Sequence, residues 1–201
     1  MRPKSLGLIA TMLVTMVIAA GGLTAPTSAL AATPPTAAAP AGPVPLPPVT
    51  ADARKKGMAA APALITGAGL PCTLADARMI GAGKETLPDG KKINVAYFEI
   101  ACTNALGYVV ATREGTPKPS AFTCVEAGSP AANGQPSPLR CILPGNQNVN
   151  ANLQTFVAKA NLPCTVSNVR PIGQTPTQTL FELACSEGNG YILTTTAPPN
   201  V

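Results

Sequence analysis

The sequence of 201 residues predicts an α+β fold with two tandem repeats, each one helix packed on a three-stranded antiparallel sheet and stapled by disulfides. Three observations support this prediction. The strings LPCTLADARMIG, YFEIAC and GYVVAT of residues 70–112 recur in the same order as LPCTVSNVRPIG, LFELAC and GYILTT of residues 162–195. Four of the six cysteines stand at matching places in these strings. The apolar blocks are short and are separated by glycine, which is typical of strands.

The N-terminus predicts export. Arg2 and Lys4 precede an uncharged apolar stretch at residues 6–20, and Ala29-Leu30-Ala31 has the small residues that a signal peptidase recognises. We therefore expect residues 1–31 to be a cleaved signal peptide. An uncleaved membrane anchor is the alternative, but the apolar stretch is short for a span of about 20 residues. The mature chain is expected in the periplasm or outside the cell, with no transmembrane segment after cleavage.

Residues 32–56 are predicted to form a Pro/Ala-rich linker. Seven prolines lie between Thr33 and Thr50, and such a stretch favours an extended polyproline conformation. Arg54-Lys55-Lys56 is expected to end the linker as a solvated junction. The rest of the chain then divides into three parts, namely a first αβββ repeat at 57–123, a disulfide-closed connector at 124–147 and a second αβββ repeat at 148–197.

Each repeat is predicted to begin with a helix. In the second copy the apolar residues of one helical face are Val149, Leu153, Phe156, Val157 and Ala160. Asn148 or Asn150 can cap the start of this helix, and Asn161 sits where a left-handed residue would end it. Gly69 takes that place in the first copy, whose helix is expected from about Met58 to Ala68.

The six cysteines are expected to form three disulfides, because an exported chain folds in an oxidising compartment. The duplication pairs four of them across the first hairpin of each copy, and the other two close the connector. The predicted pairs are Cys72–Cys102, Cys164–Cys185 and Cys124–Cys141. The chain has no C-x-x-C string, so a metal site built from these cysteines is not expected.

The first of these disulfides suggests a register for the hairpins. This register sets the following residues opposite each other: Leu74 and Ile100, Arg78 and Ala96, Val166 and Leu183, and, in the next hairpin, Cys102 and Tyr108. Because side chains alternate along a strand, one apolar face should receive the helix. Its members are Phe98, Ile100, Cys102, Tyr108 and Val110.

Two charged positions recur in both copies, Arg78 with Arg170 and Glu99 with Glu182. In the predicted register each arginine and its glutamate point to opposite faces unless a β-bulge intervenes, so we expect structural or surface groups rather than ion pairs. If the faces of the two repeats line one groove, Arg78 and Arg170 are the candidates for binding an anionic ligand group.

Catalysis is not expected. The chain contains no His, the commonest general base. Asp89 and Glu99 are the carboxylates that a hydrolase would pair, yet Asp89 lies in a turn string that the second copy lacks. We expect no cofactor and no nucleic-acid partner. Without residues 1–31 the chain has 12 basic and 9 acidic residues, a net charge of +3, and no pattern of stacking aromatics.

The blocks CTVSNVRPIG, LFELAC and GNGYIL resemble a repeat of uncharacterised secreted bacterial proteins. At the level of architecture, a helix followed by a hairpin-rich sheet is similar to PepSY and PASTA domains and to the repeats of the β-lactamase inhibitory protein. These resemblances imply enzyme inhibition, binding of cell-wall fragments and inhibition of a hydrolase, respectively. They share no diagnostic residue string with this chain and transfer no site residues.

We therefore expect an exported, non-catalytic binding or structural protein of the bacterial cell envelope or extracellular space. Its partner would be a protein or an envelope polymer. The alternative is an inhibitor of a secreted hydrolase, which would use an exposed loop rich in aromatic or acidic residues. Thr116–Ser120 and Ala127–Pro138 are long enough for such a loop, although neither has that composition.

Overall fold

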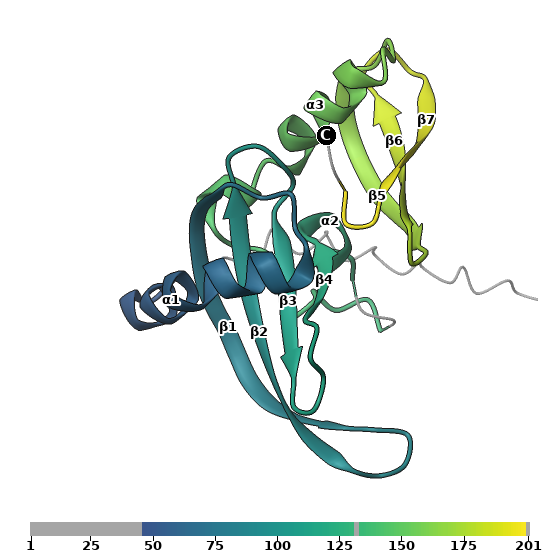
Figure 1. Ribbon diagram of the computed structural model, residues 1–201. Coiled ribbons are helices and arrows are strands. Elements are labelled where there is room, and N and C mark those ends of the chain that lie inside the picture. Colours follow the sequence, from purple (N-terminus) through teal and green to yellow (C-terminus); the bar gives the residue numbers. More distant parts are fainter. Residues whose placement is uncertain (1–45, 131–132, 200–201) are drawn as a thin grey trace, which may run out of the picture. The chain divides into compact units, whose positions relative to one another are not determined.

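The computed structural model describes residues 46–130 and 133–199, which form two antiparallel sheets (Figure 1). The predicted signal peptide at 1–31 and the linker as far as residue 45 lie outside the described residues. The first sheet has the strand order β1-β2-β3-β4, and the second has the order β5-β6-β7. The α+β class with antiparallel sheets is thus confirmed. Within the described ranges, no helix combines the length and apolar character needed to cross a bilayer.

The elements follow one another with short connections. In chain order they are α1 (Ala51–Ala68), β1 (Leu74–Thr86), β2 (Lys92–Cys102), β3 (Tyr108–Arg113), β4 (Ser120–Thr123), α2 (Cys124–Ala127), the 3₁₀ turn η1 (Pro144–Asn146), α3 (Val149–Lys159), β5 (Val166–Gln174), β6 (Gln178–Cys185) and β7 (Gly190–Thr196). The first sheet therefore has one strand more than predicted. Ser120–Thr123 forms this extra strand by pairing with Tyr108–Ala111.

Helix α1 begins seven residues before its predicted start. The Thr50 side chain accepts a hydrogen bond from the Ala53 backbone N–H at 3.2 Å and caps the helix. Asp52 and Lys56 pair one turn apart at 2.8 Å, so the basic triplet belongs to the helix and not to the linker. Gly69 ends the helix in the left-handed conformation, as the sequence predicts.

Helix α1 lies across one face of the first sheet and approaches β1 closely (Figure 1). The apolar core between them consists of Ala61, Leu64, Ala68, Leu70, Ala77, Ile100, Tyr108 and Val110. The closest approach is at Gly57, where a Cβ atom would lie 2.3 Å from the Cα atom of Arg78. The atoms that a Cβ would meet belong to the backbone of β1 and cannot move aside as a side chain could, so only glycine fits at this position of the helix.

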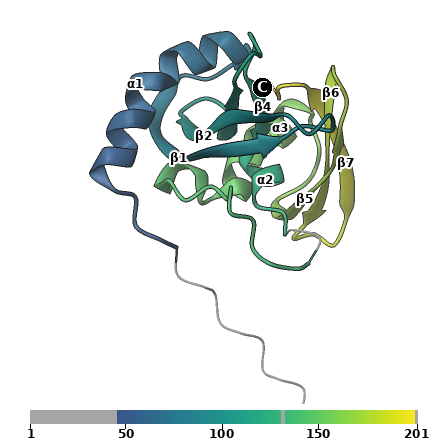
Figure 2. The same ribbon diagram turned by 90° about the horizontal axis from the view of Figure 1, so that it is seen from below.

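Helix α3 packs in the same way on the second sheet (Figure 2). Asn148 caps its start by accepting the Ala151 N–H at 3.1 Å, and Asn161 follows its end with a φ of 53°. Leu106 and Val125 join the second core, which also contains Leu153, Phe156, Val157, Phe181, Leu183 and Leu193. Both predicted helix ends at Asn148 and Asn161 are therefore confirmed.

The predicted strand register is wrong in two ways: the strands pair two residues away from the predicted register, and each first hairpin also contains two register shifts. In the first sheet the shifts fall between Leu74 and Asp76 and between Met79 and Gly81, and the second sheet has them at the matching places. The observed pairs that replace the predicted ones are Leu74–Cys102, Arg78–Glu99, Val166–Cys185 and Ile100–Tyr108. A bulge inserts one residue and thereby changes which residues share a face.

All three predicted disulfides are present. The Cα–Cα distances are 5.2 Å for Cys72–Cys102, 5.6 Å for Cys124–Cys141 and 5.2 Å for Cys164–Cys185. A native disulfide in a small domain is worth on the order of 2–4 kcal/mol. Three such bridges fit a protein that folds in an oxidising compartment.

The C-terminal segment is attached to the first sheet through Tyr108. Its buried hydroxyl donates a hydrogen bond to the Pro199 carbonyl at 2.7 Å. Burial raises the pKa of Tyr108 well above its usual range, and the nearby Glu126 carboxylate adds to this effect. The phenol is therefore held in its neutral, hydrogen-bonding form.

The contact at Gly57 makes a sharp prediction about stability. In an open helix, Gly→Ala would stabilise by about 1 kcal/mol through helix propensity. Here the new methyl group must push α1 away from β1, so we expect Gly57→Ala to lower the free energy of unfolding by about 1–3 kcal/mol. Urea denaturation with the disulfides intact measures this. A variant as stable as the native protein would contradict the close packing of α1.

Candidate functional site

Each sheet has a helix on one face and a row of three charged or apolar residues across the other, which we call the outer face. In the first sheet the row on β1, β2 and β3 is Arg78, Glu99 and Val109. In the second sheet the row on β5, β6 and β7 is Arg170, Glu182 and Ile192. Residues directly opposite on neighbouring strands share a face, so each row forms one continuous surface.

The outer face of the first sheet is built around a fully buried carboxylate, Glu99. Arg78 Nε donates to Glu99 Oε2 at 2.5 Å. Glu99 Oε1 accepts the backbone N–H groups of Ile142 and Leu143, both at 2.8 Å, and the Asn146 Nδ2 group at 2.9 Å. The charge is thus neutralised and hydrogen-bonded on all sides, which is what makes its burial possible.

Three of these partners of Glu99, namely Ile142, Leu143 and Asn146, come from the connector, so we call this surface the covered face. Arg78 is itself buried and donates through Nη2 to the Arg140 carbonyl at 3.3 Å. Asn146 donates through Nδ2 to the Ile100 carbonyl as well, at 3.3 Å. A Cβ atom at Gly107 would lie 1.9 Å from Asn146 Oδ1, so the missing side chain of this glycine makes room for the asparagine. Together these contacts fix the connector on the sheet.

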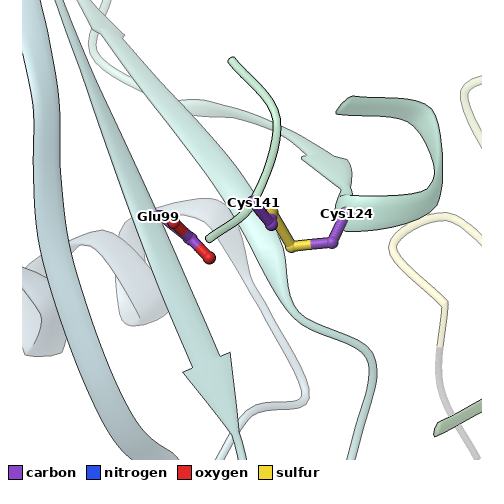
Figure 3. Close-up of side chains that lie close together, drawn as sticks. All are labelled: Glu99, Cys124 and Cys141. Atoms are coloured by element: carbon purple, nitrogen blue, oxygen red, sulfur yellow. A yellow bond between two sulfur atoms is a disulfide. The ribbon is translucent and has the colours of Figure 1, made fainter. Parts of the chain in front are cut away.

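The Cys124–Cys141 disulfide lies next to this carboxylate, as Figure 3 shows. The potential ligand atoms of Glu99 and these two cysteines lie within 4.8 Å of one another, and Glu187 forms a similar group with Cys164–Cys185. A metal ion would bind thiolates, and both pairs of sulfur atoms are joined in disulfides instead. The first group therefore serves to close the connector beside the residue that binds it.

The outer face of the second sheet has the same chemistry but is exposed, so we call it the open face. Arg170 Nε contacts Glu182 Oε2, and these side chains are 73% and 40% exposed. Ile192, opposite Glu182, is 56% exposed, whereas Val109 at the matching place in the first sheet is fully buried. An open depression of about 410 Å³ lies at this row.

The structure corrects the expectation that arginine and glutamate point to opposite faces. The bulges place Arg78 beside Glu99 and Arg170 beside Glu182, so both form ion pairs. The two arginines do not line one groove. Arg78 borders a depression with Pro138 and Ile142, and Arg170 borders the one on the open face. Each guanidinium is engaged with the carboxylate of its own sheet.

The carboxylates considered for catalysis do not form a pair. Asp89 lies in the turn between β1 and β2, where it accepts the Lys91 N–H at 2.9 Å. Glu99 is occupied by structural partners. Sequence reasoning missed Ile142, Leu143 and Asn146 as those partners. A recurring glutamate inside an apolar strand was the available signal that buried donors had to exist.

Comparison with models of protein families, with curated proteins and with solved structures finds no match for this chain. Function is therefore inferred from the two outer faces. Each face carries a row of arginine, glutamate and an aliphatic residue, and this row is buried in the first sheet and exposed in the second.

The two ion pairs make a matched experiment possible. Glu99→Gln removes a buried charge and leaves Arg78 without its partner, so we expect a loss of about 3 kcal/mol in the free energy of unfolding. Glu182→Gln makes the same change in an exposed pair and should cost less than about 1 kcal/mol. Chemical denaturation of both variants measures the difference, and equal losses would show that Glu99 does not hold the connector.

Proposed function

We propose that this chain is an exported, non-catalytic binding protein of the bacterial cell envelope or extracellular space, and that the open face is its recognition surface. One observation carries the proposal. The open face has an arginine and a glutamate like those with which the covered face holds a chain segment, yet Ile192 in the same row is 56% exposed in the described residues. The first sheet buries the matching Val109, so an exposed aliphatic side chain in this row favours an interaction site.

The comparison between the faces depends on the two sheets being copies of one duplicated unit. Several details beyond the recurring sequence support this. Thr73 donates its backbone N–H to Asn104 Oδ1 at 2.6 Å, and Thr165 donates in the same way to the Glu187 carboxylate at 3.0 Å. These hydrogen bonds lower the pKa of Glu187. The bulges and the hairpin disulfides also coincide, as two unrelated sheets would not require.

If the two sheets are copies of one unit, the row that is buried in the first sheet predicts what the exposed row of the second sheet binds. In the first copy the arginine, the glutamate and the apolar residue of the row are buried, while in the second the matching three side chains are exposed. Burying apolar area is worth about 25 cal/mol per Å². A partner that covers Ile192 would gain this free energy without disturbing the core beneath the sheet.

Binding is favoured over the alternatives by what the described residues offer. The carboxylate of Glu99 is fully engaged, and Asp89 is a turn residue. The segments at 116–120 and 127–138 hold no aromatic residue and no acid, so they do not supply the loop that a hydrolase inhibitor would use. An inhibitor acting through the open face is one form that the proposed binding can take.

Capture of partners tests the proposal. The oxidised mature protein, immobilised, is exposed to envelope extract beside two variants, Ile192→Asp on the open face and Met58→Asp on α1, where another apolar side chain is exposed. We expect a partner that the native protein and Met58→Asp retain and that Ile192→Asp loses about tenfold or more, because a charge would then be buried. Equal capture by both variants, or repeated capture of nothing, would contradict the proposal.

A further inference from the structure

We infer that the ligand of the open face is a peptide segment of a partner protein, recognised through consecutive backbone N–H groups and a side-chain carboxamide. This inference rests on the function proposed above, and it names the class of ligand. Its basis is the segment Arg140–Asn146, which occupies the covered face and shows what a surface of this composition binds.

On the covered face, the Glu99 carboxylate binds backbone N–H groups of the connector. Ile142 and Leu143 direct two successive N–H groups at Glu99, so the segment surrounds the anion with main-chain donors. The paired Arg78 binds the carbonyl of Arg140 in the same segment. Main-chain groups are common to all peptides, so the ion pair sets the position and direction of the segment and not its sequence.

Side chains of the segment supply the remaining contacts. Leu143 is fully buried and Ile142 nearly so, and both are aliphatic and uncharged. Asn146 then inserts its carboxamide beside Gly107 and donates to Glu99 and to the Ile100 carbonyl. An aliphatic pair followed within a few residues by an amide is therefore the pattern that fits.

The open face keeps the space for such a segment. The depression there is lined by the residues that match those around Asn146, namely Glu182, Leu183 and Gly190. Gly190 stands where Gly107 makes room for the carboxamide. Glu182 uses Oε2 for Arg170, and its Oε1 atom has no hydrogen bond within the described part of the chain. The depression thus lies where the first sheet holds Asn146, beside a carboxylate oxygen that can accept donors.

The Arg170–Glu182 pair on the open face favours an uncharged ligand. A carboxylate that already has its arginine gains little from a second cation, whereas neutral N–H donors add to the pair without a new unpaired charge. Ile192 takes the place of Val109 with a larger apolar side chain. An uncharged aliphatic peptide therefore suits the surface better than an anion or a basic segment.

The chain itself supplies the probe. A synthetic peptide with the sequence of residues 141–147, carrying Ser in place of Cys141 and an N-terminal acetyl group whose carbonyl stands in for that of Arg140, is titrated into the full mature protein and followed by the NMR shifts of Glu182, Gly190 and Ile192. We expect saturable shifts at these residues. Replacing the asparagine of the peptide by alanine should weaken binding about tenfold, because a hydrogen bond to a charged group is lost.

Two variants of the protein test whether the peptide binds at the open face. Glu182→Gln should weaken it about tenfold or more, since two donors lose a charged acceptor. Asp89→Asn, which alters an exposed carboxylate of the β1–β2 turn, should leave the affinity within about twofold. Binding that survives in Glu182→Gln would mean that the peptide displaces the connector of the first sheet instead, and would overturn the inference.

Other outcomes separate the inference from the proposed function. If the peptide causes no shifts at millimolar concentration while Ile192 is still needed for capture of a partner, the ligand class is wrong and the binding function stands. If sedimentation shows a dimer that Ile192→Asp abolishes, the face belongs to a second copy of the chain, which also contradicts the inference. If neither peptide binding nor partner capture is observed, the inference and the proposed function are both contradicted.

Discussion

A single buried negative charge, that of Glu99, constrains the first half of this fold. A carboxylate cannot be taken out of water unless it is paired and hydrogen-bonded, and here one arginine, two backbone amides and one carboxamide meet that need. Three of these four donors come from the connector. The path of the connector over the sheet, the disulfide that closes it beside Glu99 and the glycine that admits Asn146 all follow from this requirement.

The sequence was sufficient for features that depend on residues close together or on recurrence. Asn148 and Asn161 bound α3 as predicted, because capping depends on one residue and its neighbours. The disulfides were predictable because the recurring strings, with a cysteine at matching places in each, reduce the possible pairings. The face that carries Ile100, Tyr108 and Val110 was also correct, because a shift of two residues in the second hairpin preserves alternation.

The candidate site could not be predicted from the sequence, because it depends on strand register and on contacts between residues far apart in the chain. The first hairpin pairs two residues away from the predicted register, which alone would set Arg78 opposite Phe98. The bulge between Leu74 and Asp76 adds one more residue to β1, so Arg78 lies opposite Glu99 and two expected surface charges form a buried pair. No local pattern marks the bulge. Strand β4 and the early start of α1 were missed because the pairing with β3 and the Thr50 cap lie outside the recurring strings. The partners of Glu99 were missed because the connector lies between the recurring strings and matches neither of them.

The two outer faces carry similar rows of arginine, glutamate and an aliphatic residue in two settings. The connector covers the row of the first sheet, and we propose that a partner covers the row of the second. Hydrogen exchange at the backbone amides of Ile142 and Leu143 tests this account most directly, because these two groups bind the carboxylate. We expect both to exchange only on global unfolding, as core amides do, and to lose that protection in Glu99→Gln. Exchange as fast as in an exposed loop would contradict the account, since the carboxylate would then not be holding the connector.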